Sequence, residues 1–242
     1  MKRVAVWPYA TPMDLSGKMA DELQGVYSRG LCGAIALGLI RTKLCEVAVC
    51  FPITTIRGIT SWAVLGREWS QDEILAIKLP EGVDFVSLGS VVIKDSIDLH
   101  IRVVQYAQKR LLVDQTFAYS REEIPNCFSE VIAHIASAVA GRELTTEERG
   151  LINQWGTNDP DAYLAYLEAW SACSAFRAGV SVPNRNGALD CARKASKLDA
   201  GFEDAHKLQR MLSRPDASNG ADMLDDVAGY TEFVYPIRSE GL

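Results

Sequence analysis

Strict alternation of apolar and polar residues near the middle of the chain constrains the fold more than any other feature. It runs from 97 to 103 in the order Ile97, Asp98, Leu99, His100, Ile101, Arg102 and Val103. A strand places alternate residues on opposite faces, so this pattern predicts a strand with one buried face. Runs rich in β-branched residues flank it at 83–93 and 111–117, beyond short polar turns. Three consecutive strands in an antiparallel meander follow from this spacing.

The remaining patterns alternate between strand and helix. A short strand at 3–9 precedes a long helical pattern at 15–39, and a second strand at 44–51 ends at Pro52. Ser70 and Glu73 form a capping box that begins a short helix, and Pro125 and Gly141 bracket an apolar helix after the meander. This order predicts an α/β (α+β) domain whose mixed sheet ends in the meander.

The composition changes after this first unit. We therefore predict an α/β domain at 1–142, a polar linker at 143–157, an all-α region at 158–212 and an acidic, partly flexible tail at 213–242. Three helical patterns, near 159–176, 188–198 and 202–212, make up the all-α region.

Charge and hydropathy exclude several classes of protein. The net charge is −6 and the acidic excess lies in the second half, which argues against a nucleic-acid partner. The longest apolar run, 31–40, is about half the length of a membrane span. The start of the chain does not resemble a targeting signal, and the six cysteines lack metal-site spacing. We expect a cytoplasmic protein with free thiols, rather than metal or disulfide chemistry.

No motif in the sequence indicates catalysis. The three histidines fall on separate predicted elements, His100 being expected as a solvated strand residue, and nucleophile-elbow, zinc-protease and phosphate-loop patterns are absent. We predict no catalytic residues, no metal and no cofactor.

Several strings resemble a known family. The first strand reads RVAVWPYA, and the meander block contains Gly89, Ser90 and Val91 before two hairpin strands. These strings, with the helix after Pro125, resemble the TolB-like N-terminal domain of bacterial signalling proteins. The segment from Asn158 onward, with alanines at 188, 192 and 195, is similar to the tetratricopeptide-like repeat that commonly follows. The resemblance implies a regulatory or docking module without an effector domain in the same chain.

We therefore expect a noncatalytic protein-interaction or scaffold module of a bacterial signalling or assembly system. A helical-repeat groove would use Asn158, Tyr163 and Tyr166, although core packing of the tyrosines is the alternative. The small residues Gly30, Gly33 and Gly38 would admit another backbone at close range, in an oligomer or partner interface; the alternative is a helix that breaks near Gly30 or packs closely on its own sheet. Two aromatic residues of the apolar tail end complete the candidate contacts, Phe233 and Tyr235.

Two other functions stay open at this point. A small-ligand receptor or enzyme would use a pocket between the sheet and the 53–70 loop, with Arg57 and Arg67 for anions and Trp62 for stacking. A structural subunit of a membrane-associated assembly is suggested only by the apolar run 31–40.

Overall fold

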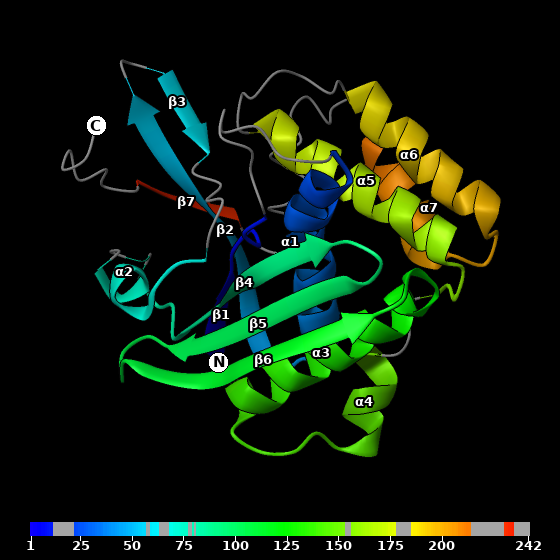
Figure 1. Ribbon diagram of the computed structural model, residues 1–242. Coiled ribbons are helices and arrows are strands. Elements are labelled where there is room, and N and C mark those ends of the chain that lie inside the picture. The colour runs from blue at the N-terminus through cyan, green and yellow to red at the C-terminus, as the bar shows by residue number, and fades with distance from the viewer. Residues whose placement is uncertain are drawn as a thin grey trace.

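The computed structural model describes residues 1–11, 22–56, 59–62, 68–76, 79, 81–152, 156–177, 185–213 and 230–234 (Figure 1). Within these ranges the chain forms a mixed sheet of seven strands, covered by helices. The coarse prediction of a mixed α/β fold is thereby confirmed.

The parallel part of the sheet is built around β1 (Lys2–Val6). It pairs in parallel with β2 (Cys45–Ile56) on one side and β4 (Phe85–Ile93) on the other. Strand β3 (Ile59–Trp62) is antiparallel to the end of β2, and β7 (Tyr230–Val234) is parallel to its middle.

Two of these strands differ from the sequence prediction. Strand β2 continues through Pro52 rather than ending there. Its pairing with β1 ends at Val49 and its pairing with β3 begins at Ile53, and between them Pro52 lies opposite Phe233 in the parallel pairing with β7. Proline has no amide N–H to donate, so Pro52 can only accept a hydrogen bond there. The stretch expected as a surface loop therefore contains a two-stranded extension of the sheet.

The predicted meander is confirmed. Strand β4 pairs antiparallel with β5 (Ile97–Gln105), which pairs antiparallel with β6 (Arg110–Tyr119). The four alternating apolar residues of β5 are buried on one face, as the pattern predicts: Ile97, Leu99, Ile101 and Val103. The turn before β6 lacks glycine, and Lys109 adopts a positive φ of 54° there.

The opposite face of the sheet is only partly polar. Trp7, Val86 and Val104 lie on it and form a second buried cluster with Trp69 and Ile74. The segment leading into α2 (Gln71–Ala76) covers this cluster, and Ser70 and Glu73 cap that helix reciprocally, as predicted. The alternation predicted a single buried face, but the other face is also buried at one end, because apolar side chains occupy it.

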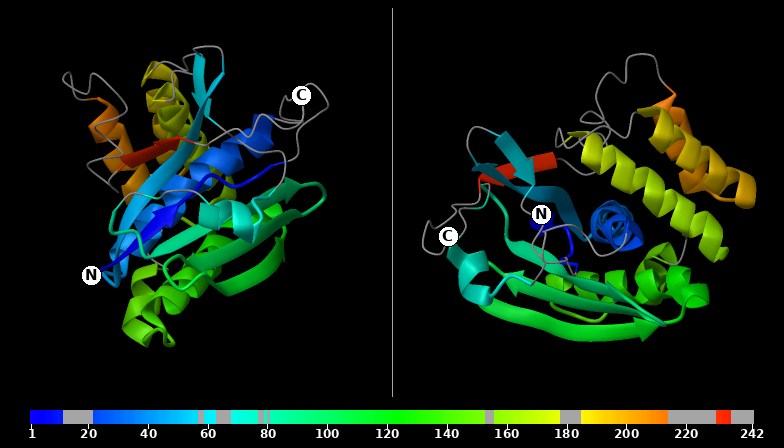
Figure 2. Two further views of the ribbon diagram at one scale, coloured as in Figure 1. Left: turned by 90° about the vertical axis from the view of Figure 1, so that its left-hand side faces the viewer. Right: turned by 45° about the horizontal axis from the view of Figure 1, so that its top comes forward.

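Helices in successive layers cover the face of the sheet on which the alternating apolar residues of β5 are buried. Helix α1 (Glu22–Arg41) and α3 (Ile124–Ala140), which follows the 3-10 turn Arg121–Glu123, contact the sheet. Figure 2 shows α5 (Pro160–Arg177) outside α1, with α6 (Arg185–Leu198) and α7 (Glu203–Leu212) outermost. One buried cluster includes residues from β1 to α7, so the α/β part and the C-terminal helices share a core.

The stretch predicted as a linker, 143–157, contains α4 (Thr146–Ile152). Thr145 and Glu148 cap it: the backbone N–H of each donates to the side chain of the other, at 2.8 and 3.2 Å. Ile152 is fully buried against the shared core.

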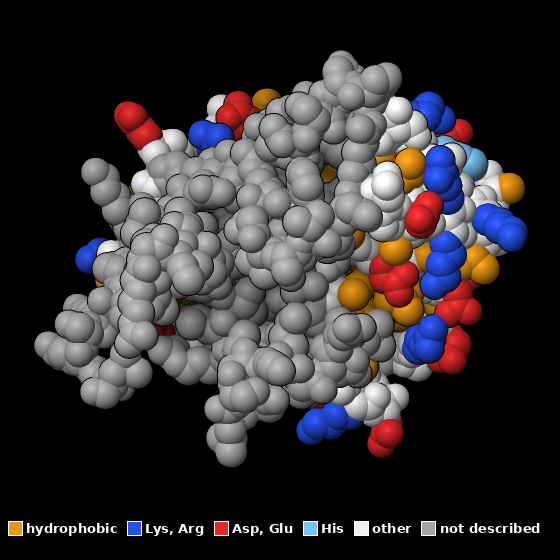
Figure 3. All heavy atoms as spheres, turned by 90° about the horizontal axis from the view of Figure 1, so that it is seen from above, with side chains coloured by type: hydrophobic (Ala, Val, Ile, Leu, Met, Phe, Trp, Pro, Cys, Tyr) orange, Lys and Arg blue, Asp and Glu red, His pale blue; other side chains and the backbone are white. Residues whose placement is uncertain are grey.

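The outer helices carry a mixed surface. Figure 3 shows basic, acidic and apolar side chains next to one another on the described part of this face. Ion pairs account for several of these neighbours, including Arg193 with Asp190 at 3.2 Å and Lys194 with Glu168 at 3.6 Å. At the inner side, Arg41 of α1 pairs with the largely buried Asp204 of α7. Among the described helices, none has the length and apolar character needed to cross a bilayer.

Candidate functional site

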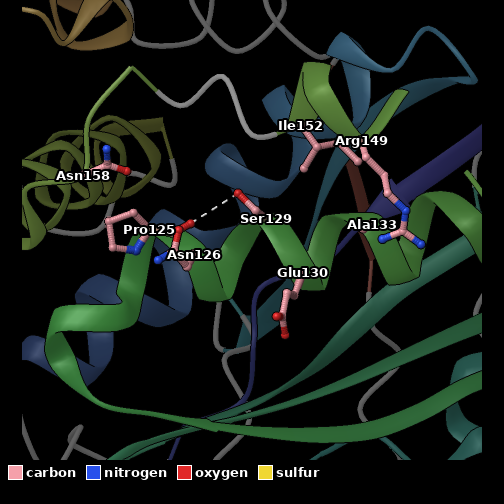
Figure 4. A pocket seen from close by; sticks show the side chains of 8 residues that line it. All are labelled: Pro125, Asn126, Ser129, Glu130, Ala133, Arg149, Ile152 and Asn158. Atoms are coloured by element: carbon pink, nitrogen blue, oxygen red, sulfur yellow. Dashed lines mark hydrogen bonds between the residues drawn. The ribbon is translucent and has the colours of Figure 1, made fainter. Parts of the chain in front are cut away.

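A pocket of about 540 Å³ opens between α3, α4 and the residues that lead into α5. Figure 4 shows the eight side chains that line it, which are Pro125, Asn126, Ser129, Glu130, Ala133, Arg149, Ile152 and Asn158. It combines polar groups from all three walls and is the candidate binding site of the described chain.

One wall of the pocket is a stripe along α3. Asn126, Ser129, Glu130 and Ala133 recur at intervals of three, one and three residues, which places them on one side of a helix. The opposite side of α3 is buried against the sheet and α1, so the helix presents this polar stripe away from the core. Ser129 is bonded to the helix itself, through its hydroxyl and the carbonyl of Pro125 at 3.4 Å (Figure 4).

The other walls come from α4 and the start of α5. Arg149 reaches the pocket from α4, which Ile152 anchors in the core. Asn158 stands before α5, whose first turn is capped by Asp159: the carboxylate accepts the backbone N–H groups of Asp161 and Ala162 at 2.8 and 3.0 Å. This cap fixes the chain direction at the residue after Asn158.

Opposite charges face the pocket from two walls. Glu130 accepts a hydrogen bond from the hydroxyl of Tyr119 at 2.9 Å, and Arg149 pairs with Glu143 at 3.1 Å. The side chain of Glu143 is 88% exposed, so this pair costs little to exchange for a ligand carboxylate. The pocket therefore offers one cationic group, one anionic group and two amides to a ligand.

The site residues predicted from the sequence differ in their exposure to solvent. Asn158 is exposed and lines the pocket. Tyr163 and Tyr166 are buried in the shared core, where the ring of Tyr163 stacks on Phe128 at 5.2 Å and that of Tyr166 lies 5.0 Å from Phe202. Burial raises the pKa of Tyr163 well above its usual value. In this structure both tyrosines pack the interior, which was the alternative to a groove.

The glycine-rich end of α1 is also covered. A Cβ atom on Gly30 would lie 2.6 Å from the carbonyl oxygen of Leu167, and one on Gly33 would lie 2.9 Å from the ring of Trp170. Gly38 is buried as well. Gly30 therefore approaches the backbone of α5 in the same chain, whereas Gly33 contacts a side chain of that helix. Gly30 and Gly33 are thus already in contact and do not form a free surface.

The remaining predicted positions cannot be placed against the pocket. Arg57, Arg67 and Tyr235 lie outside the described residues. Trp62 belongs to β3 and Phe233 to β7, where the backbone is described without the side chains. The pairing of β7 with β2 shows that residues 230–234 of the tail join the sheet of the same chain.

Sequence reasoning overlooked four pocket residues: Asn126, Ser129, Glu130 and Arg149. The stripe on α3 was visible as polar residues at helical spacing beside the apolar stripe. Its role became apparent only because α4 stands opposite it. Within the described residues, histidine, cysteine and acidic side chains form no group of three arranged to hold a metal ion.

No family model and no curated protein matches the chain. Among solved structures it is similar to TolB from Acinetobacter baumannii, with a TM-score of 0.30 and 12% sequence identity. That alignment covers 58% of this chain and 28% of the other, so the chain spans less than a third of that protein. This similarity to TolB is weak, and the repeat region stays a prediction.

Proposed function

We propose that the chain is a noncatalytic binding module that holds an extended segment of a partner protein in the pocket between α3, α4 and α5. The observation that carries this proposal is the pocket itself, with exposed Asn126 and Asn158 on two of its walls. An asparagine amide supplies one acceptor and two donors, which matches the N–H and C=O groups of a peptide backbone.

The length of the pocket supports an extended occupant. Its lining runs along α3 from Pro125 to Ala133, a helical rise of about 12 Å. Asn158 lies at the Pro125 end and Arg149 at the Ala133 end (Figure 4). An extended peptide rises about 3.3 Å per residue, so three to four residues would span this distance.

The polar lining supports a peptide over a lipophilic molecule. Sites for drug-like ligands are mostly apolar with a few polar groups. Here the apolar floor is limited to Pro125, Ala133 and Ile152, and the side chains around it are polar or charged. Arg149 would bind an acidic side chain or a carboxylate terminus of the peptide.

We propose that this module belongs to a bacterial signalling or assembly system, as the family resemblance implies, and that it works in the cytoplasm. We also assign α5, α6 and α7 to one and a half tetratricopeptide-like repeats. Support comes from the consecutive packing of these helices and from Ala188, Ala192 and Ala195, which are buried along α6.

The test is selection of a peptide against the full chain. A phage library of random 12-residue peptides would be selected on the wild type, with removal of phage that bind the Asn126→Ala, Asn158→Ala double variant. Fluorescence anisotropy then measures the affinity of each enriched peptide. Loss of two amide contacts at about 0.5–1.5 kcal/mol each predicts a Kd at least about fivefold weaker for the double variant.

Asn186→Ala is the matched control, because Asn186 is exposed on α6 away from the pocket. It should bind the same peptides with unchanged affinity. Peptides that bind the double variant as tightly as the wild type would contradict the proposal, as would failure to select any peptide.

A further inference from the structure

His100 lies between two carboxylates on the outer face of the sheet. Its Nδ1 is 2.6 Å from Oε1 of Glu68, and its Nε2 is 2.6 Å from Oδ1 of Asp114. Asp114 belongs to the neighbouring strand β6, whereas Glu68 belongs to the segment that precedes α2. The imidazole therefore joins the sheet to a segment that crosses its face.

This arrangement requires a particular protonation state. Ionised carboxylates only accept hydrogen bonds, and a neutral imidazole has a single N–H to donate. With both carboxylates ionised, only the imidazolium can donate to both at once. Loss of its proton would leave a nitrogen lone pair 2.6 Å from a carboxylate oxygen.

The bonded segment covers part of the apolar core. Residues 68–76, here called the strap, include Trp69, which is 4% exposed and meets Trp7 edge-to-face at 5.4 Å. Ile74 of the strap is fully buried in the same cluster. Opening of the strap would expose this second cluster to solvent.

We propose that the imidazolium of His100 is a pH-dependent latch that holds the strap on the sheet and weakens as the pH rises above neutral. Other contacts also fasten the strap. The hydroxyl of Ser90 donates to Glu68, the guanidinium of Arg102 donates to the carbonyl of Trp69, and the side-chain amide of Gln71 donates to the carbonyl of Lys109 at 3.0 Å. The latch thus shifts the opening equilibrium of the strap and leaves its closed form intact.

The charged surroundings of His100 all lie on this face of the sheet. Asp98 and Arg102 flank it two residues away on β5, Ser90 and Thr116 are its register partners on β4 and β6, and Glu68 and Asp114 contact it. Burial alone would lower the pKa of His100, but the hydrogen bonds to both carboxylates and their negative charges outweigh it, so the pKa is raised above 6.5.

The direction of the effect follows from this shift. A raised pKa in the closed state means that the latch contributes fully below about pH 6.5, the value of an unperturbed histidine. The contribution is lost as the pH rises through the raised pKa. Asp114 belongs to the sheet and stays beside His100 when the strap opens, whereas Glu68 moves away. Only the part of the pKa increase that Glu68 causes therefore favours the closed strap.

Hydrogen exchange of the full chain, corrected for intrinsic rates, tests the latch between pH 5.5 and 8.5. Opening of the strap should increase at least about threefold over this range. Peptides from β4 in the same digest provide the internal reference. Glu68→Gln and His100→Gln should remove the pH dependence, and His134→Gln, at an exposed histidine of α3, should retain it.

A titration of the wild type keeps the test independent of the variants. The Cε1 proton of His100 should titrate above pH 6.5 by nuclear magnetic resonance. A midpoint at or below 6.5, or strap exchange in the wild type that does not change with pH, would overturn the proposal. An equal pH dependence in the wild type and His100→Gln would overturn it as well.

Discussion

Replacement of Gly30 by alanine tests the contact on which the packing of the C-terminal helices depends. The added Cβ would lie 2.6 Å from the carbonyl oxygen of Leu167 and 3.2 Å from the carbonyl carbon and Cα of the same residue. All three atoms belong to the backbone of α5, so no side-chain rotation relieves the clash. Helices α1 and α5 must separate, or one must bend.

Two opposing effects set the size of the change. Overpacking of a well-packed core costs about 1–3 kcal/mol, and a backbone obstacle places this site near the upper end. Alanine is favoured over glycine in a helix by about 1 kcal/mol, which opposes the loss. We expect a net loss of about 1–2 kcal/mol in the free energy of unfolding, or a fall in Tm of about 2–8 °C for a chain of this size.

Urea unfolding followed by far-UV circular dichroism measures this difference. Gly150→Ala is the matched control, because Gly150 is helical and a Cβ there would meet nothing within 4 Å. The control should leave stability unchanged or raise it by up to about 1 kcal/mol. If Gly30→Ala proved as stable as Gly150→Ala, the close crossing of α1 and α5 would be refuted.

Two further predictions concern the pairing of β4 with β5 and the dependence of stability on pH below about 4.5. Gly89→Ala would place a Cβ 1.8 Å from the carbonyl oxygen of His100 on β5, so we expect a loss above about 3 kcal/mol, seen as a collapsed urea midpoint or as insoluble protein. Folded Gly89→Ala of wild-type stability would contradict the β4–β5 register. The hydrogen bonds from Arg142 and from the backbone of Thr145 lower the pKa of Glu148 to about 2. A lowered pKa stabilises the fold above about pH 4.5 and the effect fades as the pH falls toward 2, so Glu148→Gln should flatten part of the acid dependence of the urea midpoint, whereas Glu147→Gln should not.

The elements that sequence patterns predicted correctly are those with one buried face. Strand β5 alternates because only one of its faces meets the main core, and α3 has an apolar stripe between Pro125 and the left-handed Gly141. Helix α4 was missed although Thr145 and Glu148 have capping-box spacing, because the surrounding composition is polar. The positive φ of Lys109 shows that a turn forms there without the glycine that sequence rules favour.

Whether Tyr163 and Tyr166 line a groove or lie in the core could not be predicted from sequence, because α5 is buried on nearly all sides. Every residue from 162 to 167 is buried: α1 covers one side of the helix, while α6 and the start of α3 cover others. A helix covered all round has no amphipathic stripe to separate a groove from a core. Only tertiary contacts distinguish the two, and they bury Tyr163 and Tyr166 while leaving Asn158 exposed.

The packing of α5 on α1 at Gly30 also determines where one wall of the pocket lies. Asn158 stands next to the cap of α5, and the position of α5 over α1 is set by the absence of a side chain at Gly30. The α3 wall of the pocket is held independently by the sheet. Displacement of α5 would therefore move Asn158 relative to Asn126 without altering either side chain. Gly30→Ala should weaken binding of a peptide selected on the pocket, and Gly150→Ala, which leaves α5 in place, should not.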